Sequence, residues 1–335
     1  FVFFDPEHKQ KQTETQILYR EIAIALQEDQ FQLYYQPKVN MRTDSIIGAE
    51  ALIRWQHPVK GLLSPVFFLP MIENHPLIIE VGDWVLKQAL TQLQLWKEQG
   101  ITLVISVNVA ALQLQQLNFI SKLKSLLANY PQIQASQLEL EILETAALDD
   151  LQKVNKVLNE CKQLGINVAI DDFGTGYSSL TYLKHLSVET IKIDQSFIRD
   201  ILVDQNDMAI VEGILQLAKS FNRKPLAEGV ESNEHASLLL MIGCEVGQGY
   251  AIARPMPAKQ IPDWVKNYNV PMEWMQVESA QLGHAHIDLC VLAVEHYRFV
   301  AATLNAIEHK SPALFPHDCH DHNRCGLGQW LIGEG

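Results

Sequence analysis

Six acidic or amide side chains stand at the ends of separate strand-like runs of this sequence. They are Glu50, Asn108, Glu141, Asp171, Asp172 and Glu228. Oxygen ligands in this number suit hard divalent cations such as Mg²⁺ or Mn²⁺. In a barrel of parallel strands, the carboxyl ends of the strands are where catalytic residues meet. The pattern therefore predicts metal-assisted chemistry, and Lys192 stands in the same kind of position.

The segments that carry these residues alternate with helix-like stretches. Residues 13–30 have helical spacing, and two strand-like runs follow at 31–39 and 46–55, joined by a short polar connection that favours antiparallel pairing. Further strands are predicted at 103–109, 138–143, 167–171, 190–193, 225–227 and 247–250, with a helix at 147–164. Strands that alternate with helices in this number predict an α/β fold, a modified TIM-type (β/α)₈ barrel with one antiparallel strand.

The length of the chain leaves room for more than a barrel. The chain has 335 residues, 47% of them hydrophobic, and barrels of about 250 residues fold as one domain. The repeat breaks after Pro262, Pro271 marks a boundary, and residues 272–307 have a helical pattern. We expect three parts, a remnant or linker at 1–12, the barrel at 13–266 and a helical extension at 267–335.

Charge and cysteine usage narrow the partners and the compartment. The net charge of −13 disfavours a polymeric nucleic acid, since binding to a phosphate backbone depends on basic patches. Five scattered cysteines favour a reducing compartment, so we expect a cytoplasmic protein or the cytoplasmic part of a longer signalling protein. The sequence contains no uninterrupted apolar run of about 18 residues, so we expect no membrane segment in this chain. Residues 1–7 lack the features of a signal peptide.

Asp171 and Asp172 form the strongest local signal. An apolar run ends in these two adjacent carboxylates, and Gly174 and Gly176 follow. Adjacent carboxylates repel, so one would be protonated unless cations lie between them. The alternative is an N-cap aspartate beside a surface carboxylate. The glycines permit unusual backbone angles, which would suit a mobile loop beside a metal pair.

The other candidates also allow structural interpretations. Glu50 and Arg54 lie four residues apart on one strand and share a face, which is compatible with a structural ion pair. Glu141 belongs to its strand, whereas Glu144 begins the turn and could cap the next helix. Lys192 alternates with apolar neighbours, as either a solvated strand residue or an inward lysine held by carboxylates would.

At these positions the sequence resembles the EAL-domain phosphodiesterases, which hydrolyse the second messenger cyclic di-GMP. The resemblance covers residues 13–261 and keeps the order and spacing of the family's motifs. It rests on Tyr35-Gln36-Pro37, Glu50-Ala51-Leu52-Ile53-Arg54, Val107-Asn108, Glu141 to Glu144, Asp171 to Leu180, Ile191 to Asp194, Ala227 to Glu231 and Gln248-Gly249-Tyr250. Departures at Leu143, Ala110-Ala111 and residues 73–76 remove no ligand.

The resemblance implies a centre that holds two Mg²⁺ or Mn²⁺ ions and hydrolyses cyclic di-GMP to linear pGpG. The implied metal ligands are Glu50, Asn108, Glu141, Asp171, Asp172 and Glu228. The implied catalytic residues are Lys192, Glu50, Asp171 and Asp172, with Asp171 bridging the ions and Lys192 orienting the attacking water. The implied substrate contacts are Gln36, Arg54 and Gln248, with Gln248 also near the water, and Glu144 would anchor the loop 172–179.

The resemblance also bears on the assembly and on an alternative function. A homodimer is expected, since the family often dimerises through helices near the glycine loop. The alternative to an enzyme is an inactive EAL domain that binds cyclic di-GMP as a receptor and signals to a partner. All the metal ligands and Lys192 are present, which favours the enzyme.

The two ends resemble parts of other domains. Residues 1–7 are similar to the last strand of a GGDEF (diguanylate cyclase-like) domain. His296 and Cys325 match the first two ligands of the chemoreceptor zinc-binding domain, a helical bundle with a His₃Cys site, whose other two ligands would lie beyond Gly335. The resemblance implies a Zn²⁺ site in the full-length protein, and the alternative is a solvated histidine-rich loop.

Overall fold

A single sheet of ten strands organises the described part of the chain, which comprises residues 6–148, 151–176, 180–275 and 277 of the computed structural model. The strands are β1 (Phe31–Asn40), β2 (Ser45–His57), β3 (Gly61–Leu63), β4 (Ile105–Asn108), β5 (Leu138–Leu143), β6 (Asn167–Phe173), β7 (Thr190–Ile193), β8 (Lys224–Ala227), β9 (Val246–Gly247) and β10 (Met256–Pro257). Eight of them close into a barrel in the order β1-β9-β8-β7-β6-β5-β4-β2, because β1 pairs with both β9 and β2. The strands β3 and β10 extend β2 and β1 outside this ring.

One barrel strand runs against the others. Strand β1 pairs antiparallel with β2 and β9, whereas the pairs that lead from β2 through β4, β5, β6, β7 and β8 to β9 are all parallel. The predicted fold class, a (β/α)₈ barrel with one antiparallel strand, is therefore confirmed. Because the parallel strands point the same way, their carboxyl ends gather at one mouth of the barrel.

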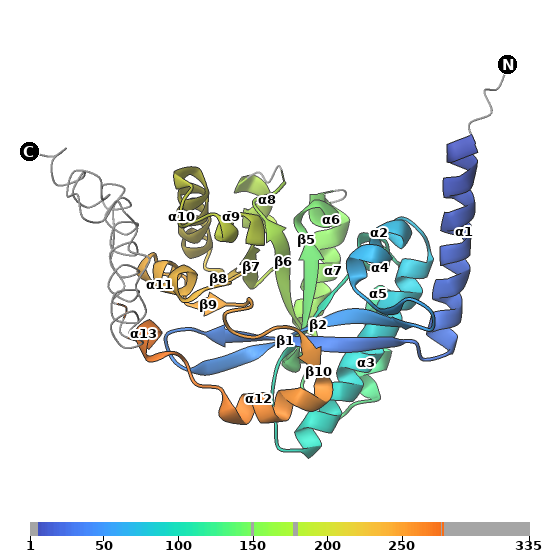
Figure 1. Cartoon of the computed structure of the whole chain (residues 1–335), viewed down its shortest axis with the longest axis horizontal. Coiled ribbons are helices and arrows are strands. Elements are labelled where there is room, and N and C mark those ends of the chain that lie inside the picture. Colours follow the sequence, from blue (N-terminus) through green and yellow to red (C-terminus); the bar gives the residue numbers. More distant parts are fainter. Residues whose placement is uncertain (1–5, 149–150, 177–179, 276, 278–335) are drawn as a thin grey trace, which may run out of the picture.

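Helices surround this barrel (Figure 1). They are α1 (Pro6–Gln27), α2 (Leu69–Ile72), α3 (Leu77–Glu98), α4 (Ala111–Leu114), α5 (Phe119–Ala128), α6 (Glu144–Leu148), α7 (Leu151–Gln163), α8 (Leu180–His185), α9 (Gln195–Arg199), α10 (Gln205–Ser220), α11 (Asn233–Met241), α12 (Ile261–Asn267) and α13 (Met272–Met275), with 3₁₀ turns at Pro65–Phe67, Ala135–Gln137 and Ala258–Gln260. Side chains cap the starts of α9, α10 and α11. Asp194, for example, accepts a hydrogen bond from the Ser196 amide at the start of α9.

The observed boundaries differ from the predicted ones where helices meet turns. The helix predicted at 13–30 is α1, which begins at Pro6, ends at Gln27 and is continuous across the expected domain boundary at residue 12. The single helix predicted at 147–164 is instead two helices, α6 and α7, and β6 extends two residues beyond Asp171. The short strands β3 and β10 were not predicted, because two or three residues carry no readable alternation.

The strands separate an apolar outer face from a polar barrel interior. On β5, Leu140 and Ile142 are fully buried among the apolar side chains beneath the helices. Glu139 and Glu141 alternate with them and meet side chains of β1 and β7 across the barrel. The barrel interior therefore brings charged side chains from different strands into contact, as an active site requires.

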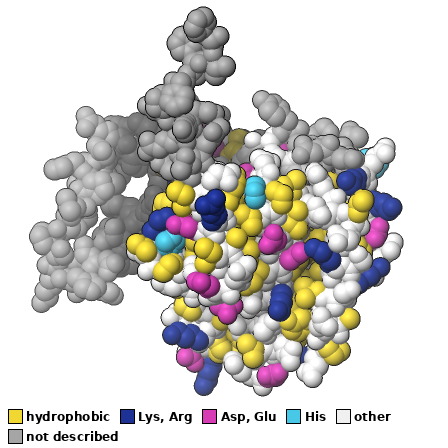
Figure 2. Space-filling model, turned by 90° about the vertical axis from the view of Figure 1, so that its right-hand side faces the viewer, with side chains coloured by type: hydrophobic (Ala, Val, Ile, Leu, Met, Phe, Trp, Pro, Cys, Tyr) yellow, Lys and Arg dark blue, Asp and Glu magenta, His cyan; other side chains and the backbone are white. Residues whose placement is uncertain are grey.

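The outer surface mixes charge types. The face turned toward the viewer in Figure 2 intersperses basic, acidic and hydrophobic side chains, and it presents no continuous basic patch. Among the described helices, none has the length and apolar character needed to cross a membrane.

The start of the predicted helical extension docks on the barrel. Trp274 in α13 is fully buried, and the Arg42 guanidinium donates hydrogen bonds to the carbonyls of Leu240 and Val277. The predicted zinc ligands His296 and Cys325 lie outside the described residues, as do residues 1–5 of the GGDEF-like start.

Candidate metal centre

Four carboxylates converge on the ammonium group of Lys192 inside the barrel mouth. Lys192 Nζ lies 2.7 Å from an oxygen of Glu141, 2.7 Å from Glu228, 2.9 Å from Asp171 and 3.7 Å from Glu50. The lysine is completely buried. Lys192 is therefore an inward lysine held by carboxylates and not a solvated strand residue.

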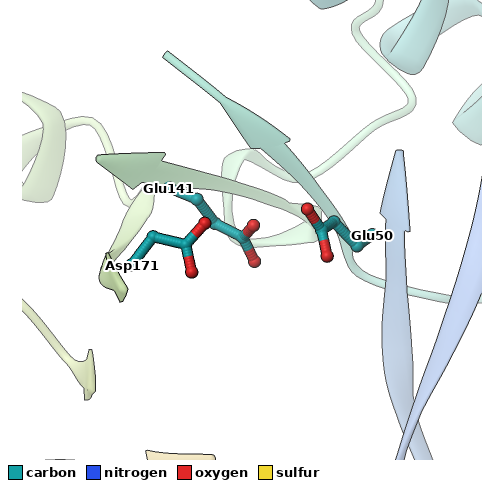
Figure 3. A group of neighbouring side chains, drawn as sticks. All are labelled: Glu50, Glu141 and Asp171. Carbon is teal, nitrogen blue, oxygen red and sulfur yellow. The ribbon is translucent and has the colours of Figure 1, made fainter. Parts of the chain in front are cut away.

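The carboxylates form two overlapping groups that could each hold a cation. Glu50, Glu141 and Asp171 make one group, and Asp171, Asp172 and Glu228 make the other, with the candidate ligand oxygens of each group within 4.8 Å of one another. Figure 3 shows Glu50, Glu141 and Asp171 pointing toward one another from three strands. Asp171 belongs to both groups, which is the arrangement that a bridging carboxylate between two ions requires.

A backbone irregularity explains how two adjacent aspartates serve one site. In a regular strand, neighbouring side chains point to opposite faces. The pairing of β6 with β7 shifts between Ile170 and Phe173, and Asp172 has a φ of 53°, in the left-handed region. Such a bulge re-aims a side chain, and a non-glycine residue with positive φ stores about 1–3 kcal/mol of strain. Because α8 begins only at Leu180, neither aspartate caps a helix.

Amide side chains fix the orientation of Glu50. Asn108 Nδ2 donates to Glu50 Oε1 at 2.7 Å, and Gln248 Nε2 donates to Glu50 Oε2 at 2.6 Å. Gln248 also reaches Gln36 Oε1 at 3.1 Å, and Gln36 Nε2 donates to the Ala253 carbonyl at 3.0 Å. Both oxygens of Glu50 are thus held, and an asparagine that donates through its nitrogen keeps its oxygen for a cation.

The charge balance of the site shifts the pKa of its members. Burial and the neighbouring carboxylates raise the pKa of Glu141 and Glu228, and burial likewise raises that of Asp171. Burial, together with Asp171 and Asp194, raises the pKa of Asp172 to about 7. Burial alone would lower the pKa of Lys192, but the surrounding carboxylates raise it well above its ordinary value. The site therefore holds more negative charge than its lysine neutralises.

The donor set fits two hard divalent cations. The site contains five carboxylates and one ammonium group. When all five carboxylates are ionised, four negative charges remain uncompensated, and two divalent cations would balance them. All the candidate donors are oxygens, which Mg²⁺ and Mn²⁺ prefer. Gln248 Oε1 is buried and has no hydrogen-bond partner among the described residues, although buried polar atoms normally have one.

Glu144 connects the site to the glycine loop. It is the first residue of α6 and is almost fully buried, and its Oε2 accepts a hydrogen bond from the Gly174 amide at 2.9 Å. Gly174 has a φ of 102°, and a side chain at Gly176 would collide with the Glu144 carboxylate. Both glycines are therefore needed for the loop to pass this close to Glu144.

Arg54 lies apart from the carboxylate cluster. Its guanidinium is half-buried, lies 5.5 Å from the centre of the Tyr34 ring and donates to the Ile53 carbonyl at 2.9 Å. Within the described part of the chain, no ion pair joins Arg54 to Glu50. The structural ion pair that the spacing allowed is therefore not formed, and the arginine keeps its charge near the mouth.

Three polar residues that the sequence did not single out lie beneath the cluster. Lys38 Nζ is 2.7 Å from Glu139 Oε1, contacts Ser106 Oγ and lies 3.3 Å from Glu141 Oε1. Each stands two residues from a predicted site residue on its own strand, as Lys38 does from Gln36. The strand period of two was the signal that could have found them.

A cavity of about 530 Å³ opens beside the centre. Asn108 forms part of its wall, together with Leu69, Glu73, Asn74, Gln115 and Ala146. Its volume lies in the range of sites that hold small molecules, roughly 300–1,000 Å³. Of the predicted metal ligands, Asn108 is the one that lines this cavity, so the cavity adjoins the centre at the end of β4.

The fold and the site together define a barrel protein with an acidic centre for two metal ions. The family model of the EAL domain matches residues 19–255 of the chain, and the chain belongs to this family. Its relatives include a cyclic di-GMP phosphodiesterase of Pseudomonas aeruginosa, 39% identical over 239 residues that cover 71% of this chain and 40% of that protein. The cyclic di-GMP phosphodiesterase PdeR of Escherichia coli is 35% identical over 268 residues, which cover 80% of this chain and 40% of PdeR.

A solved relative has the same fold with its ligand bound. The MucR phosphodiesterase in complex with cyclic di-GMP superposes with a TM-score of 0.70 at 40% identity, covering 73% of this chain and 99% of that chain. The present chain spans about two fifths of the length of the two curated relatives.

Proposed function

We propose that this chain hydrolyses cyclic di-GMP to linear pGpG at the barrel mouth, with two Mg²⁺ or Mn²⁺ ions as cofactors. The observation that carries the proposal is the pair of carboxylate groups that share Asp171 around the buried Lys192. Relatives that are cyclic di-GMP phosphodiesterases support the choice of substrate.

The ligand residues would serve the reaction by placing charge. Two divalent cations, when bound, supply a water of lowered pKa and neutralise phosphate oxygens. Glu50, Asn108 and Glu141 would hold one side of the centre, and Asp171, Asp172 and Glu228 the other. A site prepared in this way needs little rearrangement during the reaction, which is the main source of electrostatic catalysis.

Other side chains would handle the water and the substrate. Lys192 is buried among the ligands, so its ammonium protons are directed at the place where an attacking water would be oriented. The Arg54 guanidinium near the mouth is free of Glu50 and would meet a phosphate of the substrate. Gln36 and Gln248 would contact the substrate through the amide network that also holds Glu50.

The test is a product assay on the purified chain. Cyclic di-GMP incubated with the protein and Mn²⁺ or Mg²⁺ should give pGpG on chromatography, and no product should form in excess chelator. Tight binding of cyclic di-GMP without any cleavage in either metal would overturn the proposal that the chain is an enzyme. It would support the alternative that the chain is an inactive receptor. Glu50→Gln is the matched variant, since it keeps the shape of the side chain and removes its charge.

For the parts of the chain outside the barrel, the proposals concern the type of domain only. We infer a GGDEF-like remnant before residue 13 and a zinc-binding-like helical segment from residue 267, with His296 and Cys325 as two ligands of a Zn²⁺ ion in the longer protein. We also infer a homodimer and a cytoplasmic location. The greater length of the relatives supports a longer natural protein.

A further inference from the structure

A second polar layer lies in the barrel directly beneath the metal centre. Its members are Lys38 on β1, Ser106 on β4, Glu139 on β5 and Thr190 on β7. Glu139 Oε1 accepts from Lys38 Nζ at 2.7 Å and from Ser106 Oγ at 2.6 Å, and Thr190 Oγ1 lies 3.4 Å from Glu139 Oε2. Lys38 is 2% exposed, so the layer is closed to solvent around it.

Glu141 is held between two buried lysines, one from each layer. Lys192 Nζ contacts Oε2 of Glu141 at 2.7 Å, and Lys38 Nζ lies 3.3 Å from Oε1. Lys192 also contacts Asp171 and Glu228, so Oε2 is the oxygen on the side of the metal cluster. Oε1 is on the side of the lower layer, where Lys38 is the residue that contacts it among the described ion pairs.

We propose that Lys38 is a positioning residue for the metal ligand Glu141. By holding Oε1, it stops the carboxylate from rotating about its last side-chain bond and keeps Oε2 among the metal-binding oxygens. The inference rests on the proposed metal centre. It adds to that centre a residue that touches neither substrate nor metal.

Lys38 is itself held in place. The register of β1 against β2 shifts between Lys38 and Val39, and such bulges re-aim side chains. Glu139 and Ser106 then fix the ammonium group from the other side. Because Glu139 balances its charge, Lys38 adds no net positive charge that would compete with cations for Glu141.

The buried pair is not explained by stability alone. Replacing both members of a buried ion pair with uncharged residues of similar volume is often neutral or stabilising, whereas removing one member leaves a costly unpaired charge. Residues that orient metal ligands typically change metal affinity by about 10–100-fold when they are replaced. The two roles therefore predict different results for a variant in which both members are neutral.

The test is Mn²⁺ binding by calorimetry to the double variant Lys38→Met/Glu139→Gln. Glu139→Gln keeps the length of the side chain and Lys38→Met shortens it by one atom. The amide oxygen introduced at position 139 can still accept from Ser106. We expect thermal unfolding in chelator to stay near that of the unaltered protein and Mn²⁺ affinity to fall by about 10–100-fold. Lys122→Met is the matched control, since Lys122 pairs with Asp83 at the same 2.7 Å but on the surface. The Mn²⁺ affinity of this control should stay within about twofold of that of the unaltered protein.

Further variants separate the outcomes. Should the double variant not fold, Lys38→Gln/Glu139→Gln keeps polar partners for the lower layer and, being shorter at position 38, is expected to lose the same affinity. Mn²⁺ affinity unchanged in a folded double variant would overturn the role of Lys38. Glu139→Gln alone removes the carboxylate that fixes Lys38 and balances its charge, so Mn²⁺ affinity should fall in that variant too. No loss there would overturn the placing of Lys38 by Glu139. If the unaltered protein bound no Mn²⁺, the proposed metal centre would fail first, and this inference with it.

Discussion

The ammonium group of Lys192 lies 2.7 Å from Glu228 Oε1, at the centre of four carboxylates of which three are buried. Lys192 reaches all four, whereas among the described ion pairs Lys38 reaches Glu141 alone of the four. In the protein without metal, the charge of Lys192 therefore opposes the mutual repulsion of the carboxylates. The same residue would hold the attacking water in the reaction, so stability and catalysis meet at one side chain.

Lys192→Met should make folding depend on metal. Removing one member of a buried ion pair costs about 3–5 kcal/mol, because the remaining charges lose their partner. We expect a lower thermal midpoint in chelator and a large recovery in Mn²⁺, together with a fall in turnover of about 10²–10³. Thermal unfolding with and without metal measures the first effect. An unchanged midpoint in chelator would contradict the charge balance described for the site.

Glu50→Ala should abolish hydrolysis while leaving the barrel folded. The carboxylate belongs to one of the two candidate metal groups, and its loss also leaves the amides of Asn108 and Gln248 without their acceptor. Glu50→Gln keeps an acceptor and should be inactive as well, which separates lost charge from lost hydrogen bonds. Circular dichroism and the product assay measure fold and activity. Near-normal turnover in either folded variant would remove Glu50 from the metal centre.

Most of the predicted strands and site residues were inferred from strand periodicity and from the residues at strand ends. β5 was predicted at its observed bounds, and Glu141 and Lys192 lie where the ends of their strands placed them. These features are local, since an alternating apolar run and its terminal carboxylate are visible in a few residues.

What the sequence did not reveal depends on contacts between distant strands. Lys38 and Glu139 are 101 residues apart and read as ordinary polar strand residues until the barrel closes. The bulge that turns Asp172 toward Asp171 likewise depends on the pairing of β6 with β7. The spacing of Glu50 and Arg54 suggested a pair that the structure does not form, because Asn108 and Gln248 hold the carboxylate instead.

Ca²⁺ should bind at this centre and support little hydrolysis. The all-oxygen donor set accepts Ca²⁺, but this ion prefers longer bonds and more ligands than Mg²⁺ does. The reacting groups would then be held in an unsuitable geometry. We expect Ca²⁺ to compete with Mn²⁺ in calorimetry and to inhibit the product assay. Equal rates in Ca²⁺ and Mg²⁺ would argue against a reaction that depends on the precise placement of two ions.

Metal affinity should rise with pH until about pH 7. In the metal-free protein, burial and Asp171 raise the pKa of Asp172 from 3.8 to about 7. The folded value is the higher one, so ionisation of this carboxyl lowers stability between these two pH values, and a cation that binds the ionised form must displace a proton below pH 7. Calorimetry in two buffers of different ionisation enthalpy should detect more proton release at pH 6 than at pH 8. Equal release at both values would contradict the prediction.

Glu144→Ala should impair the site from a distance by releasing the glycine loop. Glu144 Oε2 accepts the hydrogen bond from the Gly174 amide, and Gly174 follows Asp172 by only two residues. Without this anchor, the bulge that aims Asp172 loses a support, so we expect a higher Mn²⁺ concentration for half-maximal activity and a lower maximal rate. Glu144→Gln keeps an oxygen acceptor and should retain more activity than Glu144→Ala.

Gly176→Ala provides a second route to the same loop. An added methyl group would collide with the Glu144 carboxylate, so the loop must move although Glu144 itself is intact. We expect this variant to raise the Mn²⁺ requirement in the same direction as Glu144→Ala. Combining the two changes should cost less than the sum of the single effects, because the alanine at position 144 removes the collision. Fully additive effects would place the consequences of Glu144 and Gly176 in separate parts of the site.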